Sequence, residues 1–213
     1  NYWIIFCTRL SGHEIARFSS PSINEVRSRP PGAEKRWPEL AWSPYGKTQI
    51  GQLDLEPVLL KFARSLDKLD MKHGHKFLSF EDYGDHVVSE LENLNNGEKF
   101  NIRSRYLIAC DGGSSKIRKS LGFNMGGRGP WRSNVSLYFR SPDFLETHGK
   151  GLGNLYFIFA PDSFGVFTAI DGKELWSYQL YFLDSTRKTE EINPEEILHR
   201  AMGETFKFEL LAT

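Results

Sequence analysis

Four strand-like segments follow one another between residues 134 and 182, and they constrain the fold more than any other feature of the chain. Turn-forming residues separate the last three segments: Pro161-Asp162-Ser163 and then Asp171-Gly172-Lys173. Short strands joined by tight turns pair antiparallel, so the pattern predicts an antiparallel sheet with one face free to cover something. The four segments are NVSLYF (134–139), NLYFIF (154–159), GVFTAI (165–170) and WSYQLYF (176–182).

Further elements are expected at both ends of the chain. YWIIFC (2–7) and IARF (15–18) are β-prone runs separated by Ser11-Gly12-His13, which predicts a hairpin. The proline-rich segment 19–47 predicts an irregular loop. Near the other end, Asn193-Pro194-Glu195-Glu196 predicts a helix start, with a cap, a proline at the first position and acids in the first turn. FKFELLA (206–212) is a last strand or a helix.

The middle of the chain predicts a helix, then strands, then a second helix. Asp54 is the expected cap of the first helix, Pro57 falls in its first turn, and apolar residues from Leu55 to Leu66 recur at helical spacing. Ser114 to Leu121 is the second helix, which Gly122 ends. The strands between them are KFLSFEDY (76–83), HVVSELEN (86–93), KFNI (99–102) and YLIAC (106–110).

The run YLIAC has no polar alternation, which is typical of a parallel strand buried on both faces. The expected fold is therefore a mixed α+β and α/β chain, with a parallel-type α/β part placed between antiparallel β parts. We assign residues 1–47 and 126–213 to an antiparallel lobe and 48–125 to the α/β lobe. Two lobes interleaved in this way meet at a cleft, where ligands commonly bind.

Composition excludes several classes of function. Lys plus Arg equals Asp plus Glu at 27 each, so nothing predicts nucleic acid or an anionic membrane as a partner. The apolar run 2–7 is too short to span a bilayer. Cys7 and Cys110 lie in apolar runs without CxxC spacing, so we expect two reduced core thiols and a cytoplasmic location. The six histidines form no metal-binding set, and no hydrolase or P-loop motif occurs.

The corner CDGGSSKIR carries the strongest functional hypothesis. Here the predicted strand delivers Asp111 to its carboxyl end, where ligands sit in open α/β sheets. An acid at this place accepts hydrogen bonds from ribose or ribityl hydroxyls, and Gly112 and Gly113 let the backbone approach a ligand. The alternative is an ordinary turn in which Asp111 only caps the next helix.

Other polar residues allow weaker hypotheses. Gln52 precedes the predicted cap Asp54 and is placed to reach a phosphate or sugar over the helix start, although an exposed loop glutamine is the common case. Basic residues gather between 116 and 132, where a solvated face is the simpler interpretation and a phosphate-bearing small molecule is the alternative. They are Lys116, Arg118, Lys119, Arg128 and Arg132, with Trp131 among them.

Taken together, four segments resemble the class A FAD-dependent aromatic monooxygenases, the group related to p-hydroxybenzoate hydroxylase and phenol hydroxylase. RYLIACDGGSSKIRKSLGF (105–123) is similar to the second flavin fingerprint of that family. The other three resemble, in the right order, the family's substrate-domain hairpin, its Gln-x-x-Leu-Glu helix and the sheet that roofs its substrate. They are CTRLSGHEIARF (7–18), GQLDLEPVLLKFAR (51–64) and residues 154–182.

The resemblance implies a p-hydroxybenzoate hydroxylase-like fold, with a partial Rossmann-like FAD-binding lobe interleaved with an antiparallel substrate lobe. It implies hydroxylation of a phenolic small molecule with FAD, NAD(P)H and O₂. Asp111 and Gly112 would contact the FAD, Arg118 is similar to the fingerprint arginine, and Gln52 is similar to the flavin-contacting glutamine. No catalytic residue is assigned.

Two motifs of the family are absent from the chain: the upstream GxGxxG and a downstream Gly-Asp pair. We therefore expect an internal segment of such an enzyme, inactive by itself. One alternative is a truncated paralogue that keeps the fold without catalysis. Another is a flavin epoxidase or reductase of the same fold that acts on a lipid or terpenoid.

Overall fold

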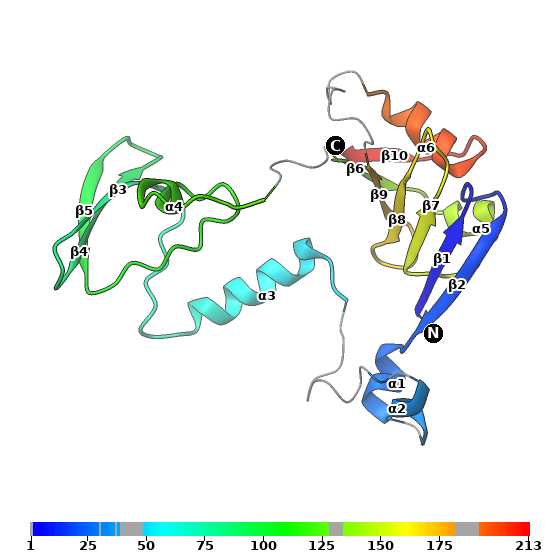
Figure 1. Cartoon of the computed structure of the whole chain (residues 1–213), viewed down its shortest axis with the longest axis horizontal. Coiled ribbons are helices and arrows are strands. Elements are labelled where there is room, and N and C mark those ends of the chain that lie inside the picture. The colour runs from blue at the N-terminus through cyan, green and yellow to red at the C-terminus, as the bar shows by residue number, and fades with distance from the viewer. Residues whose placement is uncertain (1, 30, 37, 39–48, 128–133, 182–191) are drawn as a thin grey trace. The chain divides into compact units, whose positions relative to one another are not determined.

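The computed structural model describes residues 2–29, 31–36, 38, 49–127, 134–181 and 192–213. The chain divides into two compact units, one made of Asn1–Leu55 with Pro130–Thr213 and the other of Glu56–Gly129 (Figure 1). The first unit is thus assembled from both ends of the chain. The assignment of 1–47, 48–125 and 126–213 to functional lobes stays a prediction.

The first unit holds a seven-stranded sheet, in the order β10-β6-β9-β8-β7-β1-β2. Strands β6 to β9 pair antiparallel, as the four segments predicted. The N-terminal hairpin β1–β2 is also confirmed, but β1 runs parallel to β7, so the sheet is mixed. The strands are β1 (Tyr2–Cys7), β2 (Glu14–Ser20), β6 (Asn134–Arg140), β7 (Leu155–Ile158), β8 (Gly165–Ala169), β9 (Leu175–Tyr181) and β10 (Glu209–Ala212).

One face of this sheet forms the core of the unit. Alternate residues of the strands are buried there together with apolar residues of α5 (Phe144–His148) and α6 (Pro194–Met202). Burying large aromatic side chains supplies much of the driving force for folding. The largest fully buried side chains are Trp176, Tyr156, Tyr178, Phe139, Phe144 and Phe167.

The helices of the first unit follow their capping residues. Asn193 caps α6 with Pro194 at its start, as predicted. Segment 19–47 was expected to be irregular, yet it contains α1 (Ile23–Ser28) and α2 (Ala33–Arg36). Ser22 and Glu25 form a reciprocal capping box that starts α1, and this local pairing explains the error.

The second unit contains a three-stranded antiparallel sheet of β3 (His75–Asp82), β4 (Val87–Asn93) and β5 (Lys99–Ser104). These strands agree with the prediction. Both strand pairs of this sheet are antiparallel, and the run 106–110, on which the expected parallel-type arrangement was based, is not one of its strands. Of the large apolar side chains described in this unit, Ile117 alone is buried, so the unit has little core of its own.

Helix α3 (Gln52–Arg64) links the two units in sequence. It begins three residues earlier than predicted, because the Gly51 carbonyl accepts the N–H groups of Asp54 and Leu55. Asp54 therefore lies in the first turn and is not the cap, and Pro57 lies inside the helix. None of the residues of α3 is buried, so its predicted apolar face is exposed.

The run YLIAC (106–110) is not a strand, which corrects the prediction of a doubly buried parallel strand. Tyr106 and Ile108 are 73% and 82% exposed, and none of the described strands pairs with this segment. An apolar run becomes a strand only when a neighbouring strand takes up its backbone hydrogen bonds. Cys110 is accordingly exposed and is not a core thiol, whereas Cys7 is buried as expected.

Among the described helices, none combines the length and apolar character that crossing a membrane requires.

Candidate functional site

The Asp111 corner leads into α4 (Lys116–Ser120), which is shorter than the predicted helix at 114–121. Oδ2 of Asp111 accepts the backbone N–H groups of Lys116 at 2.7 Å and Ile117 at 3.3 Å. The hydroxyl of Ser115 accepts the N–H of Arg118 and is the N-cap. Asp111 therefore does what the turn interpretation predicted, since it satisfies N–H groups at the start of α4.

The electrostatics of the corner keep the Asp111 carboxylate charged and accessible. A hydrogen bond from Ser115, together with the backbone N–H groups of Ile117 and Lys116, lowers the pKa of Asp111. A carboxylate offers about four acceptor positions, so capping α4 leaves room for a ligand hydroxyl. Gly112 has φ 76°, and a Cβ added there would meet nothing within 4 Å. The corner thus fits a hydroxyl-bearing group that approaches the backbone closely.

Arg118 lies on the same short helix. Its Nη1 donates to the carbonyl of Gly113 at 3.0 Å, which ties the guanidinium to the glycine turn. Its Nε is buried and has no partner among the described residues. Asp111, Gly112 and Arg118 are therefore brought together by the corner itself, within one unit.

The other predicted binding residues have different outcomes. Gln52 is the first residue of α3 and belongs to the other unit, so its joining Asp111 in one site stays a prediction. Lys116 and Lys119 are exposed at α4. Arg128, Trp131 and Arg132 lie outside the described residues.

The face of the seven-stranded sheet opposite the core is lined by half-exposed aromatic rings. Phe6 of β1 stacks on Phe157 of β7 with ring centroids 5.1 Å apart and meets Phe18 of β2 edge-on at 5.6 Å. Phe164 then lies 5.7 Å from Tyr181 of β9. The rings extend over five neighbouring strands, roughly 19 Å at about 4.8 Å per strand spacing. This face offers an apolar surface much wider than one aromatic ring.

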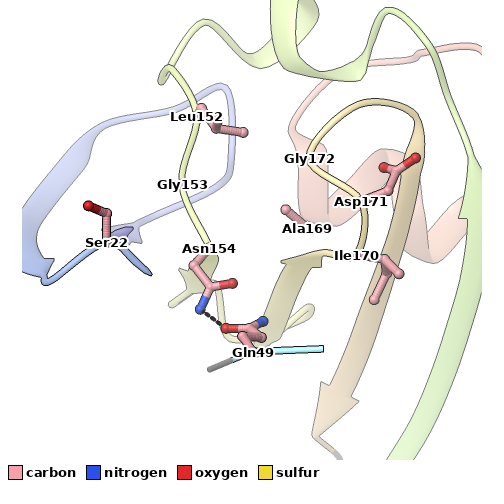
Figure 2. A pocket seen from close by; sticks show the side chains of 9 residues that line it. All are labelled: Ser22, Gln49, Leu152, Gly153, Asn154, Ala169, Ile170, Asp171 and Gly172. Atoms are coloured by element: carbon pink, nitrogen blue, oxygen red, sulfur yellow. Dashed lines mark hydrogen bonds between the residues drawn. The ribbon is translucent and has the colours of Figure 1, made fainter. Parts of the chain in front are cut away.

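A pocket of about 300 Å³ opens at the N-terminal end of β7 and the C-terminal end of β8 (Figure 2). Its apolar wall is made by Leu152, Ala169 and Ile170. Two neighbouring polar side chains also line it (Figure 2): Asn154, which precedes β7, and Gln49, which precedes α3. Asn154 Nδ2 donates a hydrogen bond to Gln49 Oε1. Ser22, Gly153, Asp171 and Gly172 also line it.

Tyr156, a core residue, fixes the pocket wall at residues 151–153, next to Asn154. The buried Tyr156 hydroxyl donates to the Gly151 carbonyl at 2.8 Å and accepts the N–H of Gly153 at 2.5 Å. Burial raises the pKa of Tyr156 to about 12, so this hydroxyl keeps its proton at neutral pH. The wall at 151–153 is therefore fixed by two hydrogen bonds from one buried side chain.

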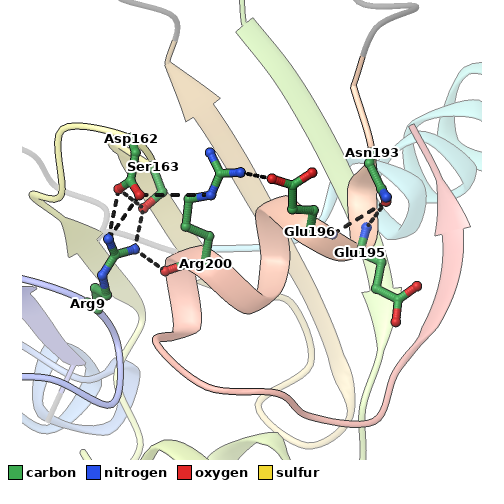
Figure 3. A network of polar contacts seen from close by, with 7 residues as sticks. All are labelled: Arg9, Asp162, Ser163, Asn193, Glu195, Glu196 and Arg200. Carbon is green, nitrogen blue, oxygen red and sulfur yellow. Dashed lines mark hydrogen bonds and ion pairs between the residues drawn. The ribbon is translucent and has the colours of Figure 1, made fainter.

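A polar network joins the β1–β2 hairpin, the turn between β7 and β8, and α6 (Figure 3). Arg9, at the tip of the β1–β2 hairpin, contacts both carboxylate oxygens of Asp162 at 3.0 Å and the Ser163 hydroxyl at 3.2 Å. Arg200 of α6 pairs with Asp162 at 3.9 Å and with Glu196. These groups pair with one another, which indicates a structural role.

The sequence profile of a family described as "FAD binding domain" matches residues 22–208, which is most of the chain. The chain belongs to this family. The FAD binding domain family is thus the group that the flavin fingerprint indicated, and FAD is confirmed as the cofactor of the family. The match includes the Asp111 corner, the aromatic rings Phe157, Phe164 and Tyr181, and all residues that line the pocket.

Curated relatives and solved structures agree with membership of the FAD binding domain family. A putative polyketide hydroxylase of Streptomyces halstedii is 30% identical over 166 residues, covering 76% of this chain and 30% of that protein. A 2,4-dichlorophenol 6-monooxygenase of Cupriavidus pinatubonensis is 30% identical over 158 residues, covering 74% of this chain and 25% of that protein. The chain therefore spans less than a third of the length of either relative.

A crystal structure of the flavin-dependent monooxygenase PieE, in complex with FAD and substrate, has a similar fold. Its TM-score is 0.78 at 21% identity, with 98% of this chain and 36% of that chain covered. This similarity shows that the mixed sheet and the separate antiparallel sheet follow the fold of flavin-dependent monooxygenases.

The sequence missed the pocket. No pattern in the sequence singled out Gln49, and Asn154 was only the first residue of the predicted strand segment 154–159. The Gly-Leu-Gly run before Asn154 marks a backbone turn, but no spacing rule connects it to Gln49, more than a hundred residues away. Only the folded sheet brings the two amides together.

Proposed function

We propose that the protein containing this chain is an FAD-dependent monooxygenase that hydroxylates an aromatic, phenolic substrate. One oxygen atom of O₂ enters the ring as a hydroxyl group and the other leaves as water, while NAD(P)H supplies the two electrons. The observation that carries the proposal is the family match over residues 22–208. Relatives named polyketide hydroxylase and 2,4-dichlorophenol 6-monooxygenase support an aromatic substrate.

The aromatic face of the seven-stranded sheet supports the same substrate class. Phe6, Phe157 and Phe18 form a stacked and edge-on group on which a flat ring can lie. Such aromatic pairs favour offset stacking and edge-to-face contacts, which a planar substrate continues. We assign this face to the substrate side of the protein.

We assign FAD binding within this chain to Asp111, Gly112, Arg118 and Gln52. Asp111 would accept a hydrogen bond from a ribityl or ribose hydroxyl, and Gly112 would leave space for the cofactor against the backbone. Arg118 would hold the glycine turn in place through the Gly113 carbonyl. FAD, when bound, supplies the electron transfer between NAD(P)H and O₂.

We further propose that residues 48–125 belong to a FAD-binding lobe of Rossmann-like type. The exposed apolar run 106–110 and the exposed apolar residues of α3 support this assignment, since such surfaces are normally covered. A cytoplasmic location remains a proposal in keeping with the buried reduced thiol of Cys7.

The test is turnover by the purified full-length protein. We expect a bound-flavin absorbance spectrum, NAD(P)H oxidation that increases when a phenol is added, and one atom of ¹⁸O₂ in the product. Asp111→Ala should weaken FAD binding, whereas Lys119→Ala, a change of an exposed residue on the adjacent helix α4, should not. A protein that purifies without flavin and shows no phenol-dependent oxidation would contradict the proposal and favour the non-catalytic paralogue.

A panel of phenols and terpenoids distinguishes the remaining alternative. Turnover of terpenoids without turnover of phenols would replace the aromatic hydroxylase by an epoxidase or reductase of the same fold.

A further inference from the structure

The amide pair Asn154–Gln49 has hydrogen-bonding capacity left over inside the pocket. One bond joins Asn154 Nδ2 to Gln49 Oε1. Asn154 Oδ1 and Gln49 Nε2 have no partner among the described residues, which leaves one acceptor and one donor. Turning both amides over would still leave one acceptor and one donor, but the acceptor would then be Gln49 Oε1; the amides as placed here make Asn154 the acceptor.

A phenolic hydroxyl matches this pair. It donates one hydrogen bond and accepts another, so a single ring oxygen can satisfy both amides at once. The ring itself would lie against the apolar wall of Leu152, Ala169 and Ile170. An ether at the same position still accepts but no longer donates, and Asn154 Oδ1 is then left without a partner.

Asp171 makes the pocket unfavourable for anions. Its Oδ1 accepts three backbone N–H groups, from Lys173, Glu174 and Leu175, at 2.9 to 3.1 Å. Burial acts to raise the pKa of Asp171, but these backbone bonds outweigh it and lower the pKa. The carboxylate therefore stays charged near neutral pH and repels a ring that carries a carboxylate group.

The pocket is pre-formed rather than dependent on a ligand. Tyr156 holds the wall at 151–153, and the backbone of Asn154 donates to the Trp3 carbonyl at 2.7 Å and accepts from the Ala169 N–H at 3.1 Å. Asn154 is thus anchored to both neighbouring strands of β7. Backbone anchored in this way does not have to be ordered when a ligand binds.

We propose that this pocket is an orienting subsite for a neutral phenolic ring, in which Asn154 and Gln49 together hold one ring hydroxyl. Both are specificity-determining residues for the substrate. The inference rests on the proposed function for its substrate class. It goes further in naming the two residues that select a phenol over its ether, and Asp171 as the residue that disfavours an acid.

The experiment measures binding by calorimetry with the full-length protein. Three matched probes are 2-naphthol, 2-methoxynaphthalene and 2-naphthoate. We expect 2-naphthol to bind about tenfold more tightly than its methyl ether, the size of one hydrogen bond, and 2-naphthoate to bind most weakly. Asn154→Leu should remove the preference for the phenol, since it removes the acceptor while keeping the volume.

Two further variants make the test specific to the pair. Leu152→Ala is the control: it should weaken 2-naphthol and its ether by the same factor and leave their ratio unchanged. Asn154→Asp and Gln49→Glu each keep one amide that can donate to the new carboxylate. The double variant has two carboxylates and no donor. Its fold-loss in affinity for 2-naphthol should therefore exceed the product of the fold-losses of the two single variants.

The outcomes separate this inference from the proposed function. An unchanged phenol-to-ether ratio in Asn154→Leu, multiplicative behaviour of the double variant, or no binding of 2-naphthol to the wild type would each overturn the subsite. Calorimetry needs no turnover. A protein that binds the probes as expected but shows no hydroxylation would refute the proposed function alone.

Discussion

Replacing Gly165 by alanine should loosen the centre of the seven-stranded sheet. Gly165 begins β8, and a Cβ built there would lie 2.4 Å from the carbonyl oxygen of Gln179 and 2.7 Å from the hydroxyl of Tyr178. Both neighbours belong to β9, and the first is backbone, which cannot rotate away. The Gly165 backbone lies outside the left-handed region, so the expected cost is steric and not conformational.

The magnitude follows from the size of the overlap. Cβ contacts under 3.0 Å are essentially never seen, so β8 and β9 must separate at this point. Overpacking a buried site costs about 1–3 kcal/mol, and we take the upper value of about 3 kcal/mol because backbone has to move. At about 1.4 kcal/mol for each factor of ten, the opening equilibrium of the strand pair should rise roughly 100-fold.

Hydrogen exchange measured by mass spectrometry on the full-length protein checks this. Amides of β8 and β9 should exchange roughly 100-fold faster in Gly165→Ala. Gly113→Ala is the matched control, because its Cβ would meet nothing within 4 Å and its φ is not positive. The steric reasoning would be refuted if Gly165→Ala exchanged within threefold of the wild type, or if Gly113→Ala disturbed β8 and β9 equally.

Three further predictions concern buried or capping groups. Burial lowers the pKa of His148 to about 4. Between pH 6.5 and 4 the unfolded chain therefore binds a proton that the folded protein does not, so the free energy of unfolding decreases as the pH is lowered. His148→Gln should flatten this part of the acid-unfolding curve, and an unchanged curve would contradict the assignment. Tyr178→Phe removes the hydroxyl that donates to the buried Ser163 carbonyl at 2.5 Å. The loss should destabilise the β7–β8 turn by about 1–3 kcal/mol, seen as faster exchange of the amides in that turn. Ser115→Ala removes the hydrogen bond from the Arg118 N–H to the cap hydroxyl. This should destabilise α4 by about 1 kcal/mol, seen as roughly fivefold faster exchange of its amides. Unchanged exchange would show that Asp111 alone suffices to cap the helix.

Much of the first unit could be predicted from local patterns. The alternation of buried and half-exposed residues along β9 sets its register, since a slip of one residue would place Trp176 and Tyr178 on the wrong face. Asn193 and Pro194 start α6 where their chemistry requires it. These features succeed because each depends on residues close in sequence and on one buried face.

The predictions failed where an element depends on residues far away in the sequence, or where a local signal was overlooked. The run 106–110 has the composition of a buried strand, but a strand also needs a neighbour, which composition does not reveal. Ser22 and Glu25 show the spacing of a capping box and were hidden by the surrounding prolines. The Asn154–Gln49 pair had no local pattern at all, because it joins segments that only the finished sheet brings together.

The parallel pairing of β1 with β7 has a consequence for the order in which the protein folds. Ile4 of the first strand pairs with Leu155, so about 150 residues must be synthesised before this edge of β1 finds its neighbour. Contacts so distant in sequence slow folding, because the chain between them must first be ordered or looped out. During translation the hairpin therefore waits with Phe6 and its free edge uncovered. Until residue 155 is available, the unpaired edge of β1 is a surface of the kind that makes partly folded chains prone to aggregate.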